Sequence, residues 1–444
     1  MKRLFLLTVL VTLGVQSTLA QTPGYEVLYS FKGGSDGSGP NGVTLAKNGV
    51  LYGTTYTGGR NTCGNGYLCG TVYELIPSTG GVWTKTVIHS FNGADGALPS
   101  VPLVIQSVPG PSLVLGANGV LYGTTDNGGS YDTNAQGVGG TVFELTPPTT
   151  VGQAWTETVL YSFQNKIQAP HAPNGGLVLD SEGSIYGTTF TSEDTRGANL
   201  GGTVFKLVPP TTGGNWTEST LIDFYPTTSL GYNPPAGLVY SSGSFFGTNY
   251  FTDQFGCGTV YELSPPATGN TWTATAIYTF GNGCNPAASL TIGQGGILYG
   301  TTITAGSGTA CQYGCGTIFQ LTPPTTTGGA WTESTIYNFT GANGDGGWPA
   351  ARLVLGKNGV LYGTNVIGGI INSSCTQGCG TVFQLSPPTT PGGTWTETIL
   401  HTFTGQTGDG SRPGPLTLVP NGALFGSTWS GGAAGFGTVF AIKP

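Results

Sequence analysis

The sequence predicts an all-β fold, a seven-bladed β-propeller with four antiparallel strands per blade, whose last blade is closed by the N-terminal strand. Three short blocks, each present seven times, carry this prediction. A Leu-Tyr-Gly-Thr-like block begins at Leu51, Leu121, Ile185, Phe245, Leu298, Leu361 and Leu424. A Gly-Thr-Val-Phe-like block begins at Gly70, Gly140, Gly202, Gly258, Gly316, Gly380 and Gly437. A Leu-Tyr-Ser-Phe-like block ends at Phe31, Phe91, Phe163, Phe224, Phe280, Phe339 and Phe403. Such periodicity is typical of units that are stable only beside their neighbours.

The repeat over residues 349–403 shows how one unit is built. It contains short runs rich in β-branched and aromatic residues, separated by turn signals, and such runs favour strands. Lys357-Asn358-Gly359 is a turn of the Asn-Gly kind that hairpins prefer. The four expected strands, called A to D in chain order, are 352–355, 360–364, 381–385 and 395–403. The insertion at 101–111 holds an extra apolar run and either adds a hairpin beside the second blade or changes its innermost strand.

The order of the blocks predicts how the ring closes. Residues 26–31 form a D-type strand before any other element, whereas the last repeat supplies A, B and C strands near 415–419, 423–428 and 437–442. Pairing of the N-terminal strand with the last C strand would leave no open sheet edge. The alternative, an open solenoid, needs capping units at both ends.

Strand direction sorts the loops into two faces. The A–B turns and the C–D connections share one face, and both are similar from repeat to repeat. The B–C and D–A loops share the other face, vary widely and carry every cysteine. Because function is commonly placed on variable loops held by a rigid frame, this second face is the predicted binding face.

The N-terminal segment, the composition and the net charge exclude several classes of location and partner. Residues 1–20 read as a secretory signal peptide, with Lys2 and Arg3 before an apolar run and a small-residue exit at Ala20. Residues 21–444 are expected to form a single domain without a membrane span. Charged residues make up 7% of the chain and the net charge is −7, with no basic patch. These values argue against nucleic acid and anionic membranes as partners. We therefore expect a secreted protein, extracellular or periplasmic.

The eight cysteines fit export to an oxidising compartment. Their spacing favours four local disulfides over metal binding, because zinc sites prefer two-residue spacers and often histidine. The expected pairs are Cys63–Cys69, Cys257–Cys284, Cys311–Cys315 and Cys375–Cys379.

The repeated unit also resembles a known family. Gly119-Val120-Leu121-Tyr122-Gly123-Thr124-Thr125, followed by the block from Gly140 to Leu145, closely resembles the tandem GloVer repeat of exported bacterial choice-of-anchor proteins. The resemblance covers essentially the whole mature chain, although no recognisable anchor is present. It implies an exported propeller-like repeat protein with no established enzymatic activity and no catalytic residues to carry over.

No catalytic set, metal site or cofactor site is predicted. His89 and His401 fill a repeat position that is tyrosine in most repeats, and His171 is a lone loop histidine. Asp-Gly pairs in the D–A loops, among them Asp345 and Asp409, suggest either turn formation or a ring of carboxylates able to hold a cation. Further loop carboxylates would allow acid–base chemistry on a glycosidic bond; they are Asp126, Asp132, Glu193, Asp194 and Asp253.

Loop aromatics are the main ligand-binding candidates. Tyr56, Phe190, Tyr250 and Trp429 follow the B-strand threonines, and Trp348 lies in a D–A loop beside Asp345. Tyr131 and Tyr313 lie in B–C loops. Such rings suit stacking on sugars or apolar ligands, and the alternative is packing between blades. The regularly repeated D-strand tryptophans are expected to pack between blades; they are Trp83, Trp155, Trp216, Trp272, Trp331 and Trp395.

These features favour a non-catalytic binding or adhesion module whose partner is a glycan or a surface protein. The alternatives are an extracellular carbohydrate-active enzyme that uses loop carboxylates, and a purely structural component of an envelope or matrix.

Overall fold

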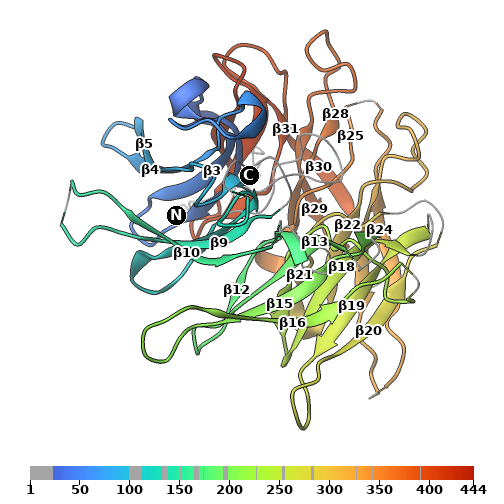
Figure 1. Ribbon diagram of the computed structural model, residues 1–444. Coiled ribbons are helices and arrows are strands. Elements are labelled where there is room, and N and C mark those ends of the chain that lie inside the picture. Colours follow the sequence, from blue (N-terminus) through green and yellow to red (C-terminus); the bar gives the residue numbers. More distant parts are fainter. Residues whose placement is uncertain are drawn as a thin grey trace, which may run out of the picture.

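The chain folds into a ring of seven antiparallel blades, as predicted. The computed structural model describes residues 24–99, 113–132, 139–150, 152–164, 170–173, 175–193, 199–226, 228–252, 256–281, 285–326, 328–342, 344–390 and 392–444. The predicted signal peptide and the insertion at 101–111 lie outside these residues. Figure 1 shows the blades following one another in chain order, which brings the blue N-terminal and red C-terminal segments together. No helix in the described ranges is long and apolar enough to cross a membrane.

Each of the first four blades is one antiparallel sheet. Blade 1 contains β2 (Ser38–Leu45), β3 (Leu51–Thr57), β4 (Thr71–Pro77) and β5 (Trp83–Ser90). Blade 2 contains β6 (Ala97–Pro99), β7 (Val114–Leu115), β8 (Leu121–Asn127), β9 (Thr141–Thr146) and β10 (Thr156–Ser162). Blade 3 contains β11 (Pro170–Pro173), β12 (Val178–Leu179), β13 (Ile185–Glu193), β14 (Asn199–Leu200), β15 (Thr203–Val208) and β16 (Thr217–Asp223). Blade 4 contains β17 (Val239–Ser241), β18 (Ser244–Thr252), β19 (Gly256–Ser264) and β20 (Thr273–Thr279).

The remaining blades repeat this arrangement. Blade 5 contains β21 (Thr291–Ile292), β22 (Leu298–Thr302), β23 (Thr317–Thr322) and β24 (Thr332–Asn338). Blade 6 contains β26 (Val354–Leu355), β27 (Leu361–Asn365), β29 (Thr381–Ser386) and β30 (Thr396–Thr402), with the short pair β25 (Gly346–Gly347) and β28 (Ile367–Gly368) beside it. Blade 7 contains β31 (Gly410–Pro413), β32 (Thr417–Leu418), β33 (Leu424–Gly431), β34 (Thr438–Lys443) and β1 (Gly24–Ser30). Short 3-10 turns lie at Gly34–Asp36, Gly64–Gly66, Ala117–Gly119, Gln294–Gly296 and Lys357–Gly359.

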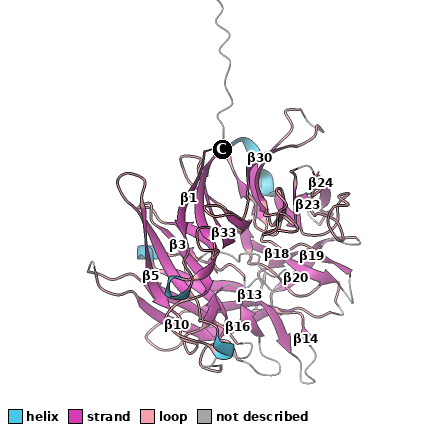
Figure 2. Ribbon diagram, turned by 90° about the horizontal axis from the view of Figure 1, so that it is seen from above, coloured by secondary structure: helices cyan, strands magenta, loops and turns pink. Residues whose placement is uncertain are grey.

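The N-terminal strand closes the ring. β1 pairs antiparallel with β34, from Gly24 opposite Lys443 to Ser30 opposite Thr438. Figure 2 shows β1 in the same blade as β33, at the end of the chain marked C. The last blade therefore takes its D strand from the opposite end of the sequence, which confirms the predicted closure.

Outside blade 1, whose β2 is continuous over Ser38–Leu45, the A strands are shorter than the sequence suggests. Of the expected strand 352–355, only β26 (Val354–Leu355) pairs with its neighbour. In blades 2, 3 and 7 an earlier X-Pro segment pairs separately with the end of the B strand. The residue before this proline has a positive φ, as at Leu98 (54°) and Arg412 (56°), and proline lacks the N–H that a continuous ladder needs. The A strand is therefore interrupted.

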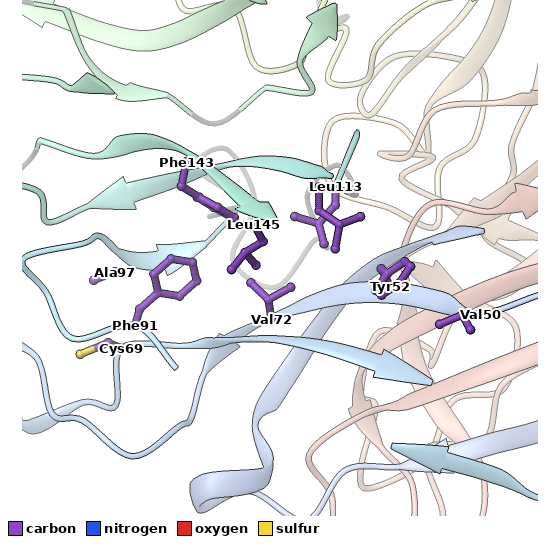
Figure 3. Packing of buried hydrophobic residues seen from close by; sticks show 10 residues of the cluster. Val50, Tyr52, Cys69, Val72, Phe91, Ala97, Leu113, Phe143 and Leu145 are labelled. Carbon is purple, nitrogen blue, oxygen red and sulfur yellow. The ribbon is translucent and has the colours of Figure 1, made fainter. Parts of the chain in front are cut away.

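Aromatic side chains join every blade to the next. The phenylalanine that ends each D strand packs on the C-strand aromatic residue of the following blade, with ring centroids 4.9–5.3 Å apart. Figure 3 shows one such contact, Phe91 on Phe143, within the core between blades 1 and 2. The seven pairs are Phe31–Tyr73, Phe91–Phe143, Phe163–Phe205, Phe224–Tyr261, Phe280–Phe319, Phe339–Phe383 and Phe403–Phe440. The Phe31–Tyr73 pair between blades 7 and 1 matches the other six, so the same aromatic contact joins every two neighbouring blades.

This packing explains the glycines and threonines of the repeated blocks. A Cβ atom on Gly363 would lie 2.4 Å from the Phe383 ring, so the B strand needs glycine where it crosses the aromatic residue. Gly380 has a φ of 94°, and a Cβ there would lie 2.5 Å from the next blade's Pro413. Within a blade, the second threonine of the B strand bonds the first of the C strand, as in Thr125–Thr141 at 2.9 Å.

The predicted role of the D-strand tryptophans is confirmed. Trp155 of blade 2 packs edge-on against Tyr52 of blade 1, with ring centroids 5.6 Å apart. Trp395 of blade 6 packs in the same way on Tyr299 of blade 5, at 6.1 Å. These tryptophan side chains therefore stabilise the contacts between neighbouring blades.

Two blades carry tyrosine where the others have a C-strand phenylalanine, and this leads to a stability prediction. The hydroxyl groups of Tyr73 and Tyr261 are fully buried and have no hydrogen-bond partner in the described structure. Replacing either tyrosine with phenylalanine is expected to raise the free energy of unfolding by about 1 kcal/mol, because a buried unsatisfied hydroxyl is removed. Thermal unfolding of Tyr73→Phe measures this. The matched control Phe383→Tyr should destabilise the protein, and a lower melting temperature for Tyr73→Phe would contradict the account.

Candidate binding face

The B–C and D–A loops meet on one side of the ring. In blade 1 these loops are residues 58–70 and 32–37, and with their equivalents they form what we call the loop face. The B–C loop and the D–A loop of one blade are tied by backbone hydrogen bonds, such as Gly59 N–H to the Gly34 carbonyl at 3.1 Å in blade 1 and Gly369 N–H to the Asp345 carbonyl at 3.1 Å in blade 6. The variable loops therefore stabilise one another through hydrogen bonds, in addition to being anchored by the strands.

Disulfides further fix the loop face. The predicted pairs Cys63–Cys69, Cys311–Cys315 and Cys375–Cys379 are confirmed. Three disulfides are typical of a protein that folds in an oxidising environment. Cys257 is buried, and Cys284 lies outside the described residues, so the fourth pair stays a prediction.

Large apolar side chains are exposed on this face. Five B–C loops each present at least one to solvent, although such residues are normally buried. Their exposed fractions are 64% for Tyr67, 52% for Tyr131, 75% for Tyr313, 65% for Ile371 and 40% for Phe436. They come from blades 1, 2, 5, 6 and 7, so the face offers apolar contacts around much of the ring. The sequence analysis singled out Tyr131 and Tyr313 as loop aromatics but missed Tyr67, Ile371 and Phe436, because side-chain exposure depends on how adjacent loops pack.

The predicted aromatic residues divide into two groups. Tyr56 and Trp429 are half-buried and in contact across the ring closure, with ring centroids 5.1 Å apart. Burial, together with the nearby Asp126 and Tyr67, raises the pKa of the Tyr56 hydroxyl. Phe190 is half-buried on blade 3, where its carbonyl oxygen accepts a hydrogen bond from Asn233 Nδ2 at 2.9 Å.

Tyr250 and Trp348 belong to a packed cluster. Tyr250 is only 9% exposed and lies in an apolar group with Ile303, Val366 and Ile367, against which Trp348 packs. For Tyr250 the packing alternative therefore describes its surroundings better than an exposed stacking platform does. The Trp348 backbone has a φ of 57°, and its buried Nε1 has no hydrogen-bond partner among the described atoms.

Asp345 and Asp409 are engaged within their own loops. Asp345 accepts hydrogen bonds from Thr340 N–H and Oγ1, both at 2.7 Å. Asp409 accepts hydrogen bonds from Thr404 N–H at 2.8 Å and from the Tyr25 hydroxyl at 2.8 Å, and it lies 3.2 Å from His401 Nε2. Burial alone would raise the pKa of Asp409, but these bonds lower it to about 2. Both carboxylates stabilise the loops, and their predicted contact with a ligand stays a prediction.

Asp126 is the unusual carboxylate of the face. It occupies in blade 2 the position held by Tyr56 in blade 1 and Trp429 in blade 7, is 5% exposed, and has one oxygen without a hydrogen-bond partner in the described structure. The Asn127 amide, oriented to satisfy both groups, donates to the other oxygen at 3.0 Å. Burial raises the pKa of Asp126 to about 7. The signal in the sequence was an acidic residue at a repeat position that is otherwise apolar.

Of the five B–C loop carboxylates predicted for acid–base chemistry, only Asp126 and Asp132 have described side chains. Asp126 is buried, and Asp132 lies half-buried in the same B–C loop of blade 2. Asp194, Asp253 and the side chains of Glu193 and His171 lie outside the described part of the chain.

The comparisons with known proteins agree with the fold. Residues 108–375 match the Gloeobacter/Verrucomicrobia repeat family. A fungal alcohol oxidase of the AA5 family, solved with copper, aligns at 15% identity with a TM-score of 0.54, covering 96% of this chain and 77% of its own. A puromycin hydrolase variant aligns at 12% identity with a TM-score of 0.53, covering 89% of this chain and 51% of its own.

A protein of unknown function from Dyadobacter fermentans aligns at 13% identity with a TM-score of 0.43, covering 94% of this chain and 97% of its own. At these identities the likeness concerns the fold alone. No curated protein matches the sequence significantly.

Proposed function

Since the chain belongs to the Gloeobacter/Verrucomicrobia repeat family, whose repeat here builds a rigid ring with varied loops, we propose that it is an exported, non-catalytic binding module. Its partner is a glycan or a cell-surface molecule that docks on the loop face. The leader-like residues 1–20 and the three disulfides support export.

The exposed B-C loop side chains are the observation that carries this proposal. Tyr67, Tyr131 and Tyr313 are at least half exposed and lie on loops of the same face. A tyrosine offers a flat apolar ring and a hydroxyl while losing few rotamers on binding, which suits contact with the faces of sugar rings. With charged residues at only 7% of the chain, stacking and neutral hydrogen bonds are the interactions this surface can offer.

The rigidity of the loops supports binding rather than passive display. The disulfide Cys63–Cys69 encloses the 3-10 turn Gly64–Gly66 and ends two residues after Tyr67. Cys311–Cys315 encloses Tyr313 in the same way. A loop already ordered before binding loses less conformational entropy when the ligand docks. Two of the three exposed tyrosines are therefore held by local cross-links.

Single alanine substitutions of Tyr67, Tyr131 and Tyr313 test the proposal. Each is expected to weaken retention on a polysaccharide that binds the wild type, by about tenfold for a central contact, because the variant loses an aromatic ring that the bound polysaccharide would cover. The substitutions should leave the melting temperature unchanged, since the rings are exposed.

Tyr240 provides the matched control for these variants. It is 56% exposed but lies beside the A–B turn of blade 4, on the opposite side of the ring. Tyr240→Ala should bind as the wild type does. Equal loss of polysaccharide retention in all four variants, or loss of retention only in Tyr240→Ala, would contradict a binding site on the loop face.

A further inference from the structure

The blades are also joined by polar contacts that recur at the same positions. Each contact uses the D-strand residue two before the terminal phenylalanine, an aspartate of the following D–A loop, and a D-strand residue of the next blade. Between blades 7 and 1 these residues are Tyr29, Asp36 and Lys85. Tyr29 donates to Asp36 at 2.9 Å, and Lys85 forms an ion pair with Asp36 at 3.0 Å. Tyr29 and Lys85 both contact Asp36 Oδ1, and the Lys32 backbone N–H donates to Oδ2 at 2.8 Å, so both oxygens of the aspartate have hydrogen donors.

Between blades 1 and 2 the same positions hold His89, Asp95 and Glu157. One ligand atom from each residue lies within 4.8 Å of the other two, the only such group of three among the described residues. The side chains of His89 and Asp95 are 16% and 13% exposed. His89 Nε2 lies 3.2 Å from Asp95 Oδ2, yet it makes no hydrogen bond of acceptable geometry, and Glu157 Oε1 is also buried without a partner.

The contact between blades 6 and 7 provides an internal comparison. His401 and Asp409 are again 3.2 Å apart, but there they form a hydrogen bond. The third position is Tyr25, whose ring stacks on His401 at 3.6 Å and whose hydroxyl donates to Asp409. With Glu157 in the third position, the contact between blades 1 and 2 brings one imidazole and two carboxyl groups together, so electron-pair donors outnumber hydrogen donors.

We infer that His89, Asp95 and Glu157 form a binding site for a divalent transition-metal ion, with Zn²⁺ as the best fit. Imidazole nitrogen and carboxylate oxygen are both good ligands for Zn²⁺, at about 2.0–2.2 Å. Atoms held at that distance from one tetrahedral ion lie roughly 3.4 Å apart. The His89–Asp95 separation already meets this spacing, and rotation of the Glu157 side chain supplies the third ligand.

The surroundings of the three residues suit a metal site. Asn92 donates to both Asp95 oxygens, from its backbone N–H and from Nδ2, each at 2.8 Å, and so fixes the carboxylate. The Phe91 ring packs nearly perpendicular to the His89 imidazole, with ring centroids 4.8 Å apart, and restricts its orientation. Such outer contacts orient metal ligands. Asp95 and Glu157 bring two carboxyl groups to one partly buried place beside the imidazole, and a cation bound there would offset their negative charge.

The ion would join two blades. His89 lies in β5 of blade 1, Asp95 lies in the connection between blades, and Glu157 lies in β10 of blade 2. The ion would link the two blades at the position where Lys85 and Tyr25 make direct contacts with an aspartate between other blades. This inference is independent of the proposed ligand on the loop face.

Metal titration of the mature, tag-free, disulfide-bonded protein tests the site. After removal of metal by chelator, calorimetry with Zn²⁺ should give one ion per chain, and Co²⁺ should give the absorption bands of a bound ion. Zn²⁺ should also raise the melting temperature, because it binds only the folded ring.

The repeat itself supplies variants that fold. His89→Tyr introduces the residue type of Tyr29 and Tyr337, and Glu157→Lys introduces that of Lys85. Both should weaken Zn²⁺ affinity by at least about 100-fold and abolish the thermal shift, since a direct ligand is lost. Glu397→Gln, at the equivalent position beside Tyr337, is the control and should bind as the wild type does. Absence of stoichiometric binding, or binding that survives both variants, would overturn the inference and leave an ordinary polar contact between blades.

Discussion

Deleting residues 21–31 is expected to prevent the protein from forming a stable monomeric ring. The deletion removes β1 and exposes the edge of β34, a site for pairing between chains. It also removes Phe31, which is fully buried against Tyr73. Loss of one buried phenylalanine costs about 3–5 kcal/mol, a large part of the stability of a typical domain. Size-exclusion chromatography and thermal unfolding should show aggregation or loss of the cooperative transition.

A circular permutation provides the control for this deletion. Gly24 lies opposite Lys443 in the sheet, so a short linker after Pro444 can return residues 21–31 to the same strand position as a hairpin. The permuted chain should recover a monomeric state with a melting temperature close to that of the wild type. A truncated protein that stays monomeric and unfolds as the wild type does would show that closure by β1 contributes little.

The second large effect concerns Asp126, whose pKa is raised to about 7 by burial. The unfolded chain releases this proton near pH 4, so between about pH 4 and 7 the folded state binds more protons. Stability from this group is therefore full below pH 4 and is lost as the pH rises through 7. Asp126→Asn should raise the free energy of unfolding at pH 8 by up to about 4 kcal/mol and flatten the pH profile.

Asp409 provides a control of opposite sign. Its pKa is lowered to about 2, so its contribution is present above pH 4 and is lost as the pH falls toward 2. Asp409→Asn should therefore destabilise the protein at pH 8. Melting temperatures of both variants and the wild type from pH 2 to 8 check the two signs together. If the melting temperatures of Asp126→Asn and the wild type depended on pH in the same way, the account of Asp126 as a buried carboxyl that ionises near pH 7 would be contradicted.

Features that depend on local sequence were predictable. The Asn358-Gly359 turn has positive φ values of 57° and 77°, as a tight hairpin turn of the Asn-Gly kind requires. Three local disulfides followed from spacing, and closure followed from the position of the extra D-strand block. The A strands were predicted too long, because the positive φ before each proline is not visible in the pattern of apolar residues.

Features that depend on neighbouring blades were not predictable from one repeat. His89 was correctly placed as a strand residue in the tyrosine position, but its meeting with Glu157 depends on the packing of two blades. Tyr250 and Tyr313 are both tyrosines on or near B–C loops, yet one is 9% and the other 75% exposed. Side-chain exposure is set by the adjacent loops, and these are the parts of the chain that vary most.

Screening the mature, disulfide-bonded protein against bacterial, plant and fungal polysaccharides, scored for both retention and release of reducing ends, tests the central claim most directly. Our account predicts retention on at least one polysaccharide without release of reducing ends. Release would identify an enzyme and direct attention to the loop carboxylates. Neither retention nor release would contradict a glycan-binding loop face and favour a protein partner or a structural role.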